Sequence, residues 1–375
     1  MSPRRVILVD DERAAGLGPL ASTRPTFAIR CGLYTPLERY LASPDFEVVG
    51  LRVRPELADV TRELAPHIPV NPAAVSADDE IDGRTIDFGP LGGGLHTLER
   101  PWHVVDRNGA AVAADIRSGK FPQAELPTHA TAVGPAEDLF LDPSATVNPF
   151  AVFDTTAGPI YVGPDAVIDS FSKIEGPAAI CEGGRILSAR IRGGTTVGPH
   201  CRVGGEIEAS VFQGCSNKYH DGFLGHAFVG EWVNIGAATN NSDLRNDYGD
   251  VHVPMAAGDR VEKIATGSKK AGVYLGDHVK TAIGSLFNTG TTVGEMAVVA
   301  PGGRLTPKFV PPFSRIWHGE IDNGLDLEAA LSTAKTAMGR RGKELSRAAE
   351  DLLRLRHAQT AGLRQNVIAS RKPEP

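Results

Sequence analysis

The sequence predicts a mainly β protein whose central part is a coil of short parallel strands, a parallel β-helix. Large aliphatic residues recur every six positions, at Val162, Ile168, Ile174, Ile180 and Ile186. Small residues follow the first four of them after four positions: Ala166, Ser172, Ala178 and Gly184. A helix requires apolar recurrence near 3.6 residues and an ordinary strand near 2, so a period of six fits neither. It fits a coil in which each side sends one aliphatic side chain inward and a small residue turns the corner.

Three further runs keep this spacing in new phases. They are Ile191, Val197, Val203, then Val211, Asn217, Phe223, Val229, Ile235, and finally Leu275, Thr281, Phe287, Val293, Val299. The alternative is a β-sandwich with coincidental spacing, and the number of in-phase positions disfavours it. The pattern is similar to the hexapeptide-repeat, left-handed parallel β-helix, whose left-handed crossovers depart from the usual right-handed rule.

Residues 1–140 lack the six-residue period and are predicted to form a small α/β domain. The short apolar, β-branched runs Val6–Val9 and Phe46–Val53 indicate strands, whereas Leu37–Leu41 and Pro55–Leu64 indicate short helices. The glycine-rich stretch 89–94 is predicted to be a loop.

The coil is predicted to span residues 141–319 and to be followed by a helical segment, residues 320–375, because apolar residues return at helical spacing from Leu327 onward. The six-residue phase fails over Asn240–Gly272, where we expect a protruding loop. The C-terminal segment is rich in Lys and Arg. Such a helix could contact anionic ligands or a membrane surface, but a solvated face packed on the coil is the better interpretation.

Composition excludes several classes of protein. A formal charge of −6 argues against nucleic acid as the main partner. No apolar run has the length of a membrane span, and the first residues lack the apolar region of a signal peptide, so we expect a cytoplasmic protein. The four cysteines show no metal-binding spacing and are interpreted as free thiols, mostly buried, and no metal site is predicted.

The richest polar cluster lies in the third run and contains His220. A second polar stretch, which contains Asn234, follows about one coil of eighteen residues later, so the two should lie close together along the stack. An imidazole with a pKa near neutrality can take a proton from an attacking amine or hydroxyl, and backbone N–H groups at glycine-rich corners could hold a developing oxyanion. The alternative is that His220 is a surface or subunit-interface histidine.

Six motifs in the coil carry a family resemblance. They are SNKYHDGFLG (216–225), VGEWVNIGA (229–237), TNNSDLRNDYG (239–249), LGDHVK (275–280), FNTGTTVG (287–294) and PPFSRIWHG (311–319). The stretch from Gly163 to Gly319 resembles the acetyltransferase half of the bifunctional glucosamine-1-phosphate N-acetyltransferase/N-acetylglucosamine-1-phosphate uridylyltransferase family. The whole chain more closely resembles a divergent bacterial branch of sugar nucleotidyltransferases built on that plan. The resemblance implies a homotrimer with sites between neighbouring coils, acetyl-CoA as donor and an amino-sugar phosphate as acceptor.

The resemblance also assigns roles to residues of this chain. His220 falls on the general base that deprotonates the sugar amine, and Arg192 on an arginine that grips the sugar phosphate, to which a guanidinium fork is suited. Asn234 falls on an asparagine that contacts the sugar, and Asn246 and Tyr248 fall near an Asn-Tyr stretch of the site.

Departures from the family pattern suggest a different acceptor. Phe223 stands where the better-known enzymes have a tyrosine, so one hydrogen bond to the sugar or the phosphate is missing. Glu208 stands near a second phosphate-binding lysine, which Lys218 could replace. The insertion at Asn240–Gly272 lengthens a loop that we expect at the mouth of the site.

The N-terminal domain offers a weaker signal. The segment from Val9 to Pro25 corresponds, in the divergent branch, to the phosphate loop of nucleotidyltransferases. Gly16, Gly18 and Arg24, with Arg30, could cradle UTP or another nucleoside triphosphate. The alternative is a strand-to-loop turn with structural arginines. The sequence shows no convincing second acidic motif for Mg²⁺, so Mg²⁺ is expected only if this domain is active.

We therefore hypothesise an acetyl-CoA-dependent N-acetyltransferase of nucleotide-sugar biosynthesis that acts on glucosamine-1-phosphate or a similar compound. Two alternatives remain open. One is a non-catalytic trimeric binding or scaffold protein, and the other is a nucleotidyltransferase whose coil serves only for assembly. Retention of His220, Arg192 and Asn234 together favours the first hypothesis.

Overall fold

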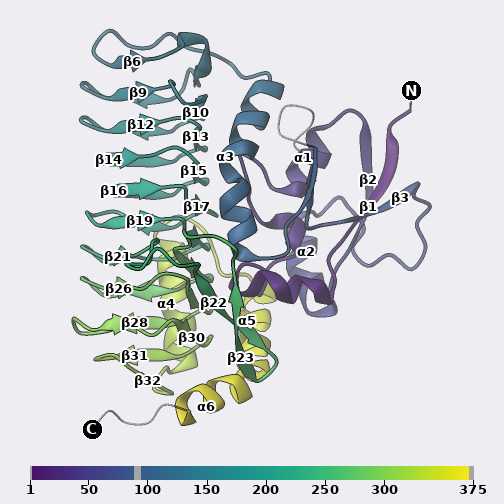
Figure 1. The fold of residues 1–375 in the computed structure, drawn as a ribbon. Helices are drawn as coiled ribbons and strands as arrows, with labels where there is room; N and C mark the ends of the chain where they lie inside the picture. The colour runs from purple at the N-terminus through teal and green to yellow at the C-terminus, as the bar shows by residue number, and fades with distance from the viewer. Residues whose placement is uncertain (1, 88–93, 371–375) are drawn as a thin grey trace.

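The computed structural model describes residues 2–87 and 94–370, and its main body is a three-sided coil of parallel strands (Figure 1). Each side of a turn pairs with the corresponding side of the next turn as a parallel sheet. The predicted left-handed parallel β-helix, with a small N-terminal domain and C-terminal helices, is thus confirmed. The predicted loop at 89–94 lies, except for Gly94, outside the described residues.

The strands are short because each runs only from one corner of the coil to the next. The first side contains β7 (Leu139–Leu141), β10 (Ile160–Val162), β13 (Ala178–Ile180), β15 (Thr195–Val197), β17 (Val211–Phe212), β20 (Phe228–Val229), β24 (Val273–Leu275), β27 (Thr291–Val293) and β30 (Phe309–Val310). The second side contains β8 (Thr146–Val147), β11 (Val167–Ile168), β18 (Asn217–Lys218), β25 (Lys280–Thr281), β28 (Val298–Ala300), β31 (Arg315–Trp317) and the antiparallel β32 (Glu320–Asp322).

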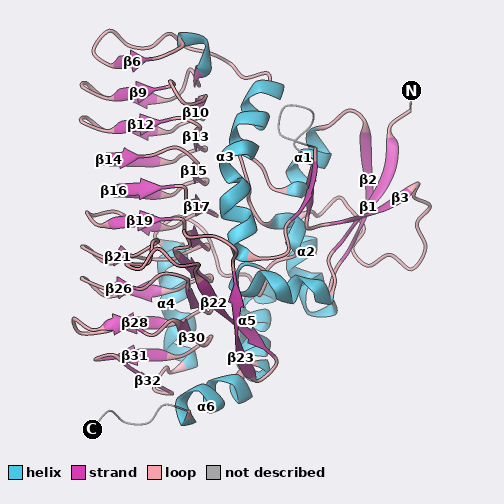
Figure 2. Cartoon of the chain, in the orientation of Figure 1, coloured by secondary structure: helices cyan, strands magenta, loops and turns pink. Residues whose placement is uncertain are grey.

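The third side contains β6 (Thr131–Val133), β9 (Val152–Asp154), β12 (Lys173–Glu175), β19 (Phe223–Gly225), β21 (Asn240–Asn241), β26 (Leu286–Phe287) and β29 (Leu305–Thr306). Two longer strands, β14 (Arg185–Ile191) and β16 (Arg202–Glu208), bend around the corner between the second and third sides and belong to both. The 3-10 turn η5 (Ala136–Asp138) precedes β7. Figure 2 shows the ladder of strands beside the helices.

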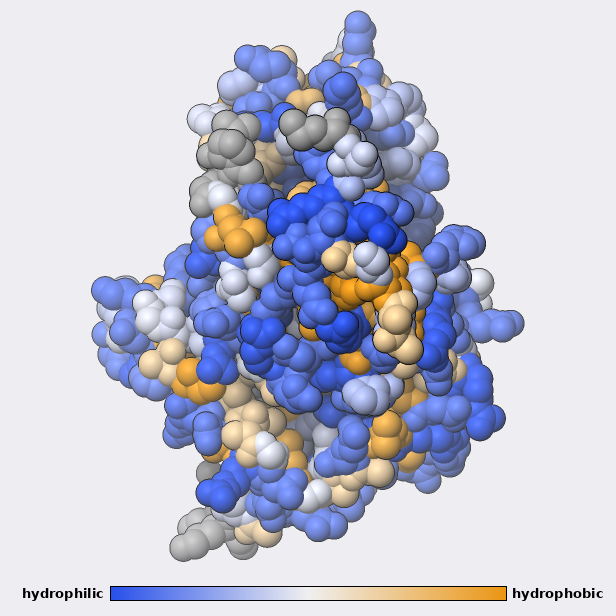
Figure 3. Space-filling model, turned by 90° about the vertical axis from the view of Figure 1, so that its right-hand side faces the viewer, coloured by the Kyte–Doolittle hydropathy of each residue, from blue (hydrophilic) through white to orange (hydrophobic). Residues whose placement is uncertain are grey.

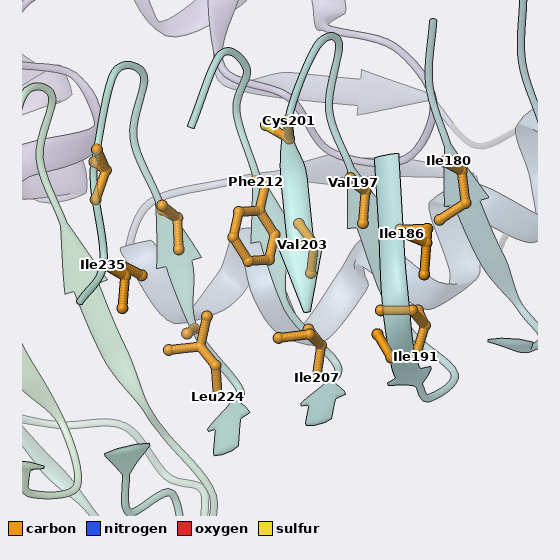
Figure 4. Close-up of a cluster of buried hydrophobic side chains, with 14 of the residues drawn as sticks. Ile180, Ile186, Ile191, Val197, Cys201, Val203, Ile207, Phe212, Leu224 and Ile235 are labelled. Carbon is orange, nitrogen blue, oxygen red and sulfur yellow. The ribbon is translucent and has the colours of Figure 1, made fainter. Parts of the chain in front are cut away.

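Stacked aliphatic side chains fill the interior of the coil (Figure 4). On the second side, Ile168, Ile186 and Val203 lie in register on successive turns, and none of them is exposed. Burial of apolar side chains stabilises a fold by roughly 1.5–3 kcal/mol per Val or Ile relative to exposure. The coil therefore has a core of its own that extends along its whole length.

The first half of the predicted third run, Val211, Asn217 and Phe223, is displaced by one residue from the positions that point into the coil. Phe212 and Leu224 belong to the coil interior, whereas Val211 packs outward and Phe223 is half-buried on the surface. The reason is that Val229 follows Leu224 after five residues instead of six, so a period of six counted back from Val229 is displaced by one residue. The second inward position of this run is therefore Lys218 rather than Asn217.

The N-terminal domain is a three-stranded parallel sheet, with β1 (Arg4–Val9) between β2 (Phe46–Arg52) and β3 (Asp79–Asp82). The predicted helices are α1 (Pro36–Ala42) and the 3-10 turn η3 (Pro55–Leu57) followed by α2 (Ala58–Leu64). Two further 3-10 segments, η1 (Glu12–Leu20) and η2 (Thr26–Ala28), follow β1, and a hairpin of β4 (Thr85–Asp87) and β5 (Leu95–Thr97) follows β3.

Helix α3 (Pro101–Ser118) lies along the first side of the coil and connects the two domains (Figure 1). The sequence did not predict it, and Gly109 at its centre is unfavourable for a helix. In the structure this glycine allows a close approach, because a Cβ there would lie 3.2 Å from the Cα of Gly194 in the coil. Asn108 donates from Nδ2 to the Gly194 carbonyl at 2.8 Å, which fixes the helix at this point.

The expected protruding loop at Asn240–Gly272 is instead an antiparallel hairpin of β22 (His252–Ala257) and β23 (Arg260–Ala265). Its inner residues Val253 and Met255 are buried against η1 and the first side of the coil. Apolar burial therefore holds this insertion against the body of the protein.

Three C-terminal helices fold back on the coil and the N-terminal domain (Figure 2): α4 (Leu327–Gly339), α5 (Arg347–Gln359) and α6 (Ala361–Ala369). Ser346 caps α5 and its hydroxyl also donates to Glu63 on α2, at 2.6 Å. The four cysteines are free thiols, with Cys215 half-buried and the others buried. Within residues 2–87 and 94–370, no helix is long and apolar enough to cross a bilayer.

A buried ion-pair cluster fastens the N-terminal domain to the coil. The Arg24 side chain is 11% exposed, bonds Asp277 through Nη2 and lies 3.4 Å from Glu231. Thr23 also donates to Asp277. Although burial by itself raises the pKa of Asp277, the Arg24 guanidinium holds it below its usual value. The charged form of the pair is therefore the stable one at neutral pH.

Arg24→Gln should lower the free energy of unfolding by about 3–5 kcal/mol, because it leaves the Asp277 carboxylate buried without its cation. Arg190→Gln is the matched control. Arg190 pairs with Glu206 at 2.6 Å but its side chain is 67% exposed, so its loss should cost about 0–1 kcal/mol. Urea denaturation measures both values, and equal losses would contradict the fastening role of Arg24.

Candidate functional site

His220 occupies the corner between the second and third sides of the coil, in the short connection from β18 to β19. Its side chain is exposed, as are those of Tyr219 and Asp221, and the rings of Tyr219 and His220 are 5.2 Å apart. The next turn stacks directly on this corner, since the Ala238 amide donates to the Asp221 carbonyl at 2.9 Å. The structure thus brings together the two polar stretches that the sequence placed one coil apart.

Asn234 is exposed on the second side and is the strand partner of Asn217, one turn away. Arg341, from the segment between α4 and α5, donates to the Asn217 side chain at 2.6 Å. Asn234 therefore lies near the His220 corner but on the adjacent side of the coil.

Lys218 points into the coil rather than toward the surface, and it is only 1% exposed. Its ammonium donates to the backbone carbonyls of Gly204 at 2.9 Å and His220 at 2.8 Å. Burial lowers the pKa of Lys218 to about 8, and the carboxylate of Asp221 partly opposes this shift. A buried ammonium cannot contact a substrate outside the coil, so we leave Lys218 out of the substrate-binding set. Its contacts instead hold the backbone of the His220 corner.

Arg192 and Phe223 lie on the third side. Arg192 is at the end remote from His220, where its guanidinium lies 3.2 Å from Glu206 and 3.3 Å from Glu208. Phe223 begins β19, and its amide donates to the Asn240 side chain at 2.7 Å. One side of the coil thus carries an imidazole at one end and a guanidinium at the other.

Asn246 and Tyr248 are exposed on a turn that leaves the coil after β21. The Tyr248 amide donates to the Arg245 carbonyl at 3.1 Å. The turn follows the end of the third side at which Arg192 lies, so the structure groups these two residues with Arg192 rather than with His220.

The sequence reading missed a cluster at the Arg192 end of the third side, formed by Glu208, His226 and Asp243. Their ligand atoms lie within 4.8 Å of one another, and His226 Nδ1 is 2.8 Å from Asp243 Oδ2. Burial opposes ionisation of Asp243, but the hydrogen bond with His226 holds its pKa below the usual value. Lys270 pairs with Glu208 at 2.8 Å, so cations already neutralise this cluster. His226 follows Glu208 after 18 residues, and Asp243 follows His226 after 17, so each step is about one turn of the coil. This spacing is the signal in the sequence that could have revealed the cluster.

The three N-terminal residues expected to hold a nucleotide do not form one cradle. Gly16 lies against Glu99, whose carbonyl oxygen would be 2.6 Å from an added Cβ, and Gly18, with φ +53°, packs on Met255. Gly18 lines a pocket between the domains, whereas Arg24 lines a separate cleft of about 530 Å³ together with Arg30.

Two acidic residues that the sequence reading did not pair meet at the carboxyl end of the N-terminal sheet, the edge at which open α/β sheets bind ligands. Arg13 lies 2.6 Å from Asp11 after β1 and 3.4 Å from Asp82 at the end of β3. Arg84 pairs with Asp82 at 2.6 Å. The hydrogen bond from Arg13 lowers the pKa of Asp11. Both carboxylates are thus already paired with guanidiniums.

Comparisons with known proteins agree with this architecture. Residues 6–86, which contain β1 to β3, match the family described as "Sugar nucleotidyl transferase". A "Bifunctional sugar-1-phosphate nucleotidylyltransferase/acetyltransferase" of Sulfurisphaera tokodaii is 32% identical over 97 residues, which are 26% of this chain and 23% of that protein. A "Bifunctional protein GlmU" of Synechococcus elongatus is 28% identical over 200 residues, 52% of this chain and 41% of that protein.

Among solved structures, a Francisella novicida UDP-N-acetylglucosamine acyltransferase is 14% identical. The match covers 65% of this chain and 91% of that one with a TM-score of 0.32, which is too low to bear on function.

The structure is a left-handed parallel β-helix with a small N-terminal domain, and that domain is similar to the sugar nucleotidyltransferase family over residues 6–86. Parts of the chain are similar to bifunctional sugar-1-phosphate nucleotidylyltransferase/acetyltransferases. The chain matches less than half of the length of either relative, 23% and 41%.

Lys218→Met should reduce the rise of the free energy of unfolding with pH, because it removes the contribution of this one ammonium. The pKa of about 8 in the folded chain lies below the ordinary 10.5, so the unfolded chain binds more protons between these pH values. The free energy of unfolding therefore rises with pH in this window, by about 3 kcal/mol at most.

Urea denaturation at about pH 7 and about pH 10 should show a smaller rise in Lys218→Met than in the wild type. The remainder comes from Lys280, whose pKa burial also lowers to about 8. The exposed Lys173, which pairs with Glu175 at 2.7 Å, provides the control Lys173→Met. An unchanged rise in Lys218→Met would show that the ammonium is not buried in solution.

Proposed function

We propose that this protein is an acetyl-CoA-dependent N-acetyltransferase that acts on an amino-sugar phosphate in nucleotide-sugar biosynthesis. The supporting observation is the placement of His220: an exposed imidazole on a corner whose backbone carbonyl is held by Lys218 from inside the coil, at 2.8 Å. A general base must hold its position relative to the proton it takes, and a rigid stacked corner meets that requirement. The relation to the bifunctional family supports the same chemistry.

In this proposal the sugar amine attacks the thioester carbonyl of acetyl-CoA while His220 accepts a proton from the nitrogen. The C–N bond forms and the C–S bond breaks, and coenzyme A leaves as its thiolate, which takes up a proton. Arg192 binds the phosphate of the acceptor as a charge-assisted pair. A phosphate there competes with Glu206 and Glu208, which now pair with the guanidinium.

The acceptor is expected to differ from glucosamine-1-phosphate in detail. Phe223 cannot donate a hydrogen bond from its ring, and Glu208 repels a phosphate where a lysine would attract it. Asn234 contacts the sugar in this proposal, and Asn246 and Tyr248 contact a ligand near Arg192. All of these contacts come from the coil, which extends beyond the predicted bounds of 141–319, from β6 (Thr131–Val133) to β32 (Glu320–Asp322).

We also propose a homotrimer in which neighbouring coils share the site. Asn234 lies on the second side of the coil. His220 lies at one end of the third side, and Arg192, Asn246 and Tyr248 lie at or beyond its other end. A second copy whose side faces the first can complete the set, and closed cyclic assemblies of one chain are the common form of oligomer.

His220→Ala should reduce acetyl transfer by about 10²- to 10⁴-fold, as expected for loss of a general base, with an unchanged melting temperature. The assay follows free thiol release from acetyl-CoA with a panel of amino-sugar phosphates. His252→Ala, on the exposed end of the insertion hairpin, should keep full activity.

Light scattering of both variants should give the mass of three chains. Full activity in His220→Ala would contradict the mechanism, and a monomeric mass would contradict the shared site. A wild type without turnover on any acceptor would favour the scaffold alternative.

Nucleotidyl transfer is a second candidate, which the match of residues 6–86 favours. The residues present do not fit the Mg²⁺ that such a reaction uses, because Arg13 bonds both oxygens of Asp11 and Arg84 bonds both oxygens of Asp82. We therefore expect little or no Mg²⁺-dependent pyrophosphate release from UTP and a sugar phosphate. Robust release that Asp82→Asn abolishes and Asp79→Asn does not would establish the second function.

A further inference from the structure

Lys280 is a half-buried lysine that the proposed acetyl transfer at the His220 corner does not use. It lies on β25 and is the strand partner of Asn234. Its neighbour Val279 belongs to the coil core, so the Lys280 side chain points outward on the second side. Figure 3 shows a mostly hydrophilic surface on the side of the N-terminal domain, and charged side chains on such a surface stay hydrated. Lys280 instead faces helix α4, which lies against the coil (Figure 1).

A cavity of about 270 Å³ lies between Lys280 and α4, and we call it the α4 cavity. Its walls are mostly apolar. Met296 and Val298 come from the coil, and Ala330 and Ala334 come from α4. Because Lys280 is half-buried and not fully enclosed, a small reagent can reach its ammonium from solvent.

The ammonium of Lys280 is poorly compensated at this place. It donates to the Trp232 carbonyl, and the described residues provide no other hydrogen-bond partner for its three N–H groups. Burial lowers the pKa of Lys280 to about 8, and the carboxylate of Asp277 partly opposes this shift. Asp277 is already paired with Arg24. A large fraction of Lys280 is therefore the neutral amine near neutral pH.

The other titratable groups of the α4 cavity do not act as a counter-ion for Lys280. Burial lowers the pKa of His278 to about 4, so its imidazole is neutral at pH 7. Asp326 is exposed before the start of α4, where it accepts a hydrogen bond from the Ala329 amide at 2.8 Å. Water and salt screen a carboxylate in that position.

The walls of the α4 cavity favour one type of product from a nucleophilic amine. A carbamate is an anion and a protonated imine is a cation, and both would face mostly apolar side chains at a cost. An amide is neutral, and its N–H can still donate to the Trp232 carbonyl. Acylation of Lys280 therefore removes the cost of burying the ammonium, and the cavity provides space for the acyl group.

We propose that Lys280 is a modification site at which the chain takes up a short acyl group from a thioester. The neutral Nζ attacks the thioester carbonyl, the C–N bond forms and the C–S bond breaks. The thiol leaves as its thiolate, which takes up the proton that the nitrogen loses. The acyl group then occupies the α4 cavity. The step uses no residue of the His220 corner, so it does not depend on acetyl transfer to a sugar.

The test incubates the full-length protein with S-acetyl-N-acetylcysteamine, a small thioester without a nucleotide, and follows each lysine by peptide mass spectrometry. No amino sugar is present, so the proposed acetyl transfer does not contribute. Lys173, which pairs with Glu175 at 2.7 Å on the surface, is the internal reference. At about pH 7.5, Lys280 should react about tenfold faster than Lys173, because more of it is deprotonated, although its lower basicity offsets part of the gain.

The pH profile separates this reaction from ordinary surface labelling. The rate at Lys280 should level off above about pH 8, whereas the rate at Lys173 should keep rising to about pH 10. Equal rates at the two lysines, or a rate at Lys280 that keeps rising to about pH 10, would overturn the proposal whether or not acetyl transfer to a sugar is observed.

Ala330→Leu tests the role of the α4 cavity, because the larger side chain fills the space that the acyl group needs. It should slow acetylation of Lys280 about tenfold, since the attacking geometry is disturbed, and leave Lys173 unchanged. Ala337→Leu is the matched control: Ala337 is also half-buried on α4 but does not line the cavity. An unchanged rate at Lys280 in a folded Ala330→Leu would contradict the proposal, and the wild-type pH profile tests it even if this variant does not fold.

Discussion

The structure depends on the stacking of one inward side chain per side of the coil on that of the next turn. Ile168, Ile186 and Val203 show this arrangement on the second side, where each is fully buried. Each turn contributes too little apolar surface to be stable alone, and repetition gives a continuous core. A long, rigid body results, against which α3, η1 and the insertion hairpin pack.

The remaining elements attach to this body through a mixture of apolar and charged contacts. Helix α3 lies on the first side because Gly109 permits a close approach to Gly194. The N-terminal domain is fastened by Arg24 to Asp277 and Glu231. A pair of this kind is costly to bury and costly to break, so it specifies the docking geometry more than it adds net stability. These attachments bring the N-terminal domain, the coil and the C-terminal helices together.

The rigidity of the coil also shapes the candidate site. Lys218 replaces an aliphatic residue in the stack, and its ammonium bonds the carbonyls of Gly204 and His220. A buried charge lowers stability unless its hydrogen bonds compensate. Lys218 therefore gives up apolar packing in the core, and its hydrogen bonds fix the backbone of the corner that bears His220. Arg192 lies at the other end of the third side, held by Glu206 and Glu208.

The sequence by itself determined the coil, because the six-residue period arises from local geometry that repeats along the chain. It also determined β1, β2, α1 and α2, whose patterns are local. Tertiary structure alone decided the phase of Phe212, Lys218 and Leu224, which depends on one corner that is a residue shorter. It also decided the partners of Arg24 and the meeting of Glu208, His226 and Asp243. Each of these depends on contacts between residues distant along the chain, and spacing within one sequence does not specify which turns, domains and helices come to lie side by side.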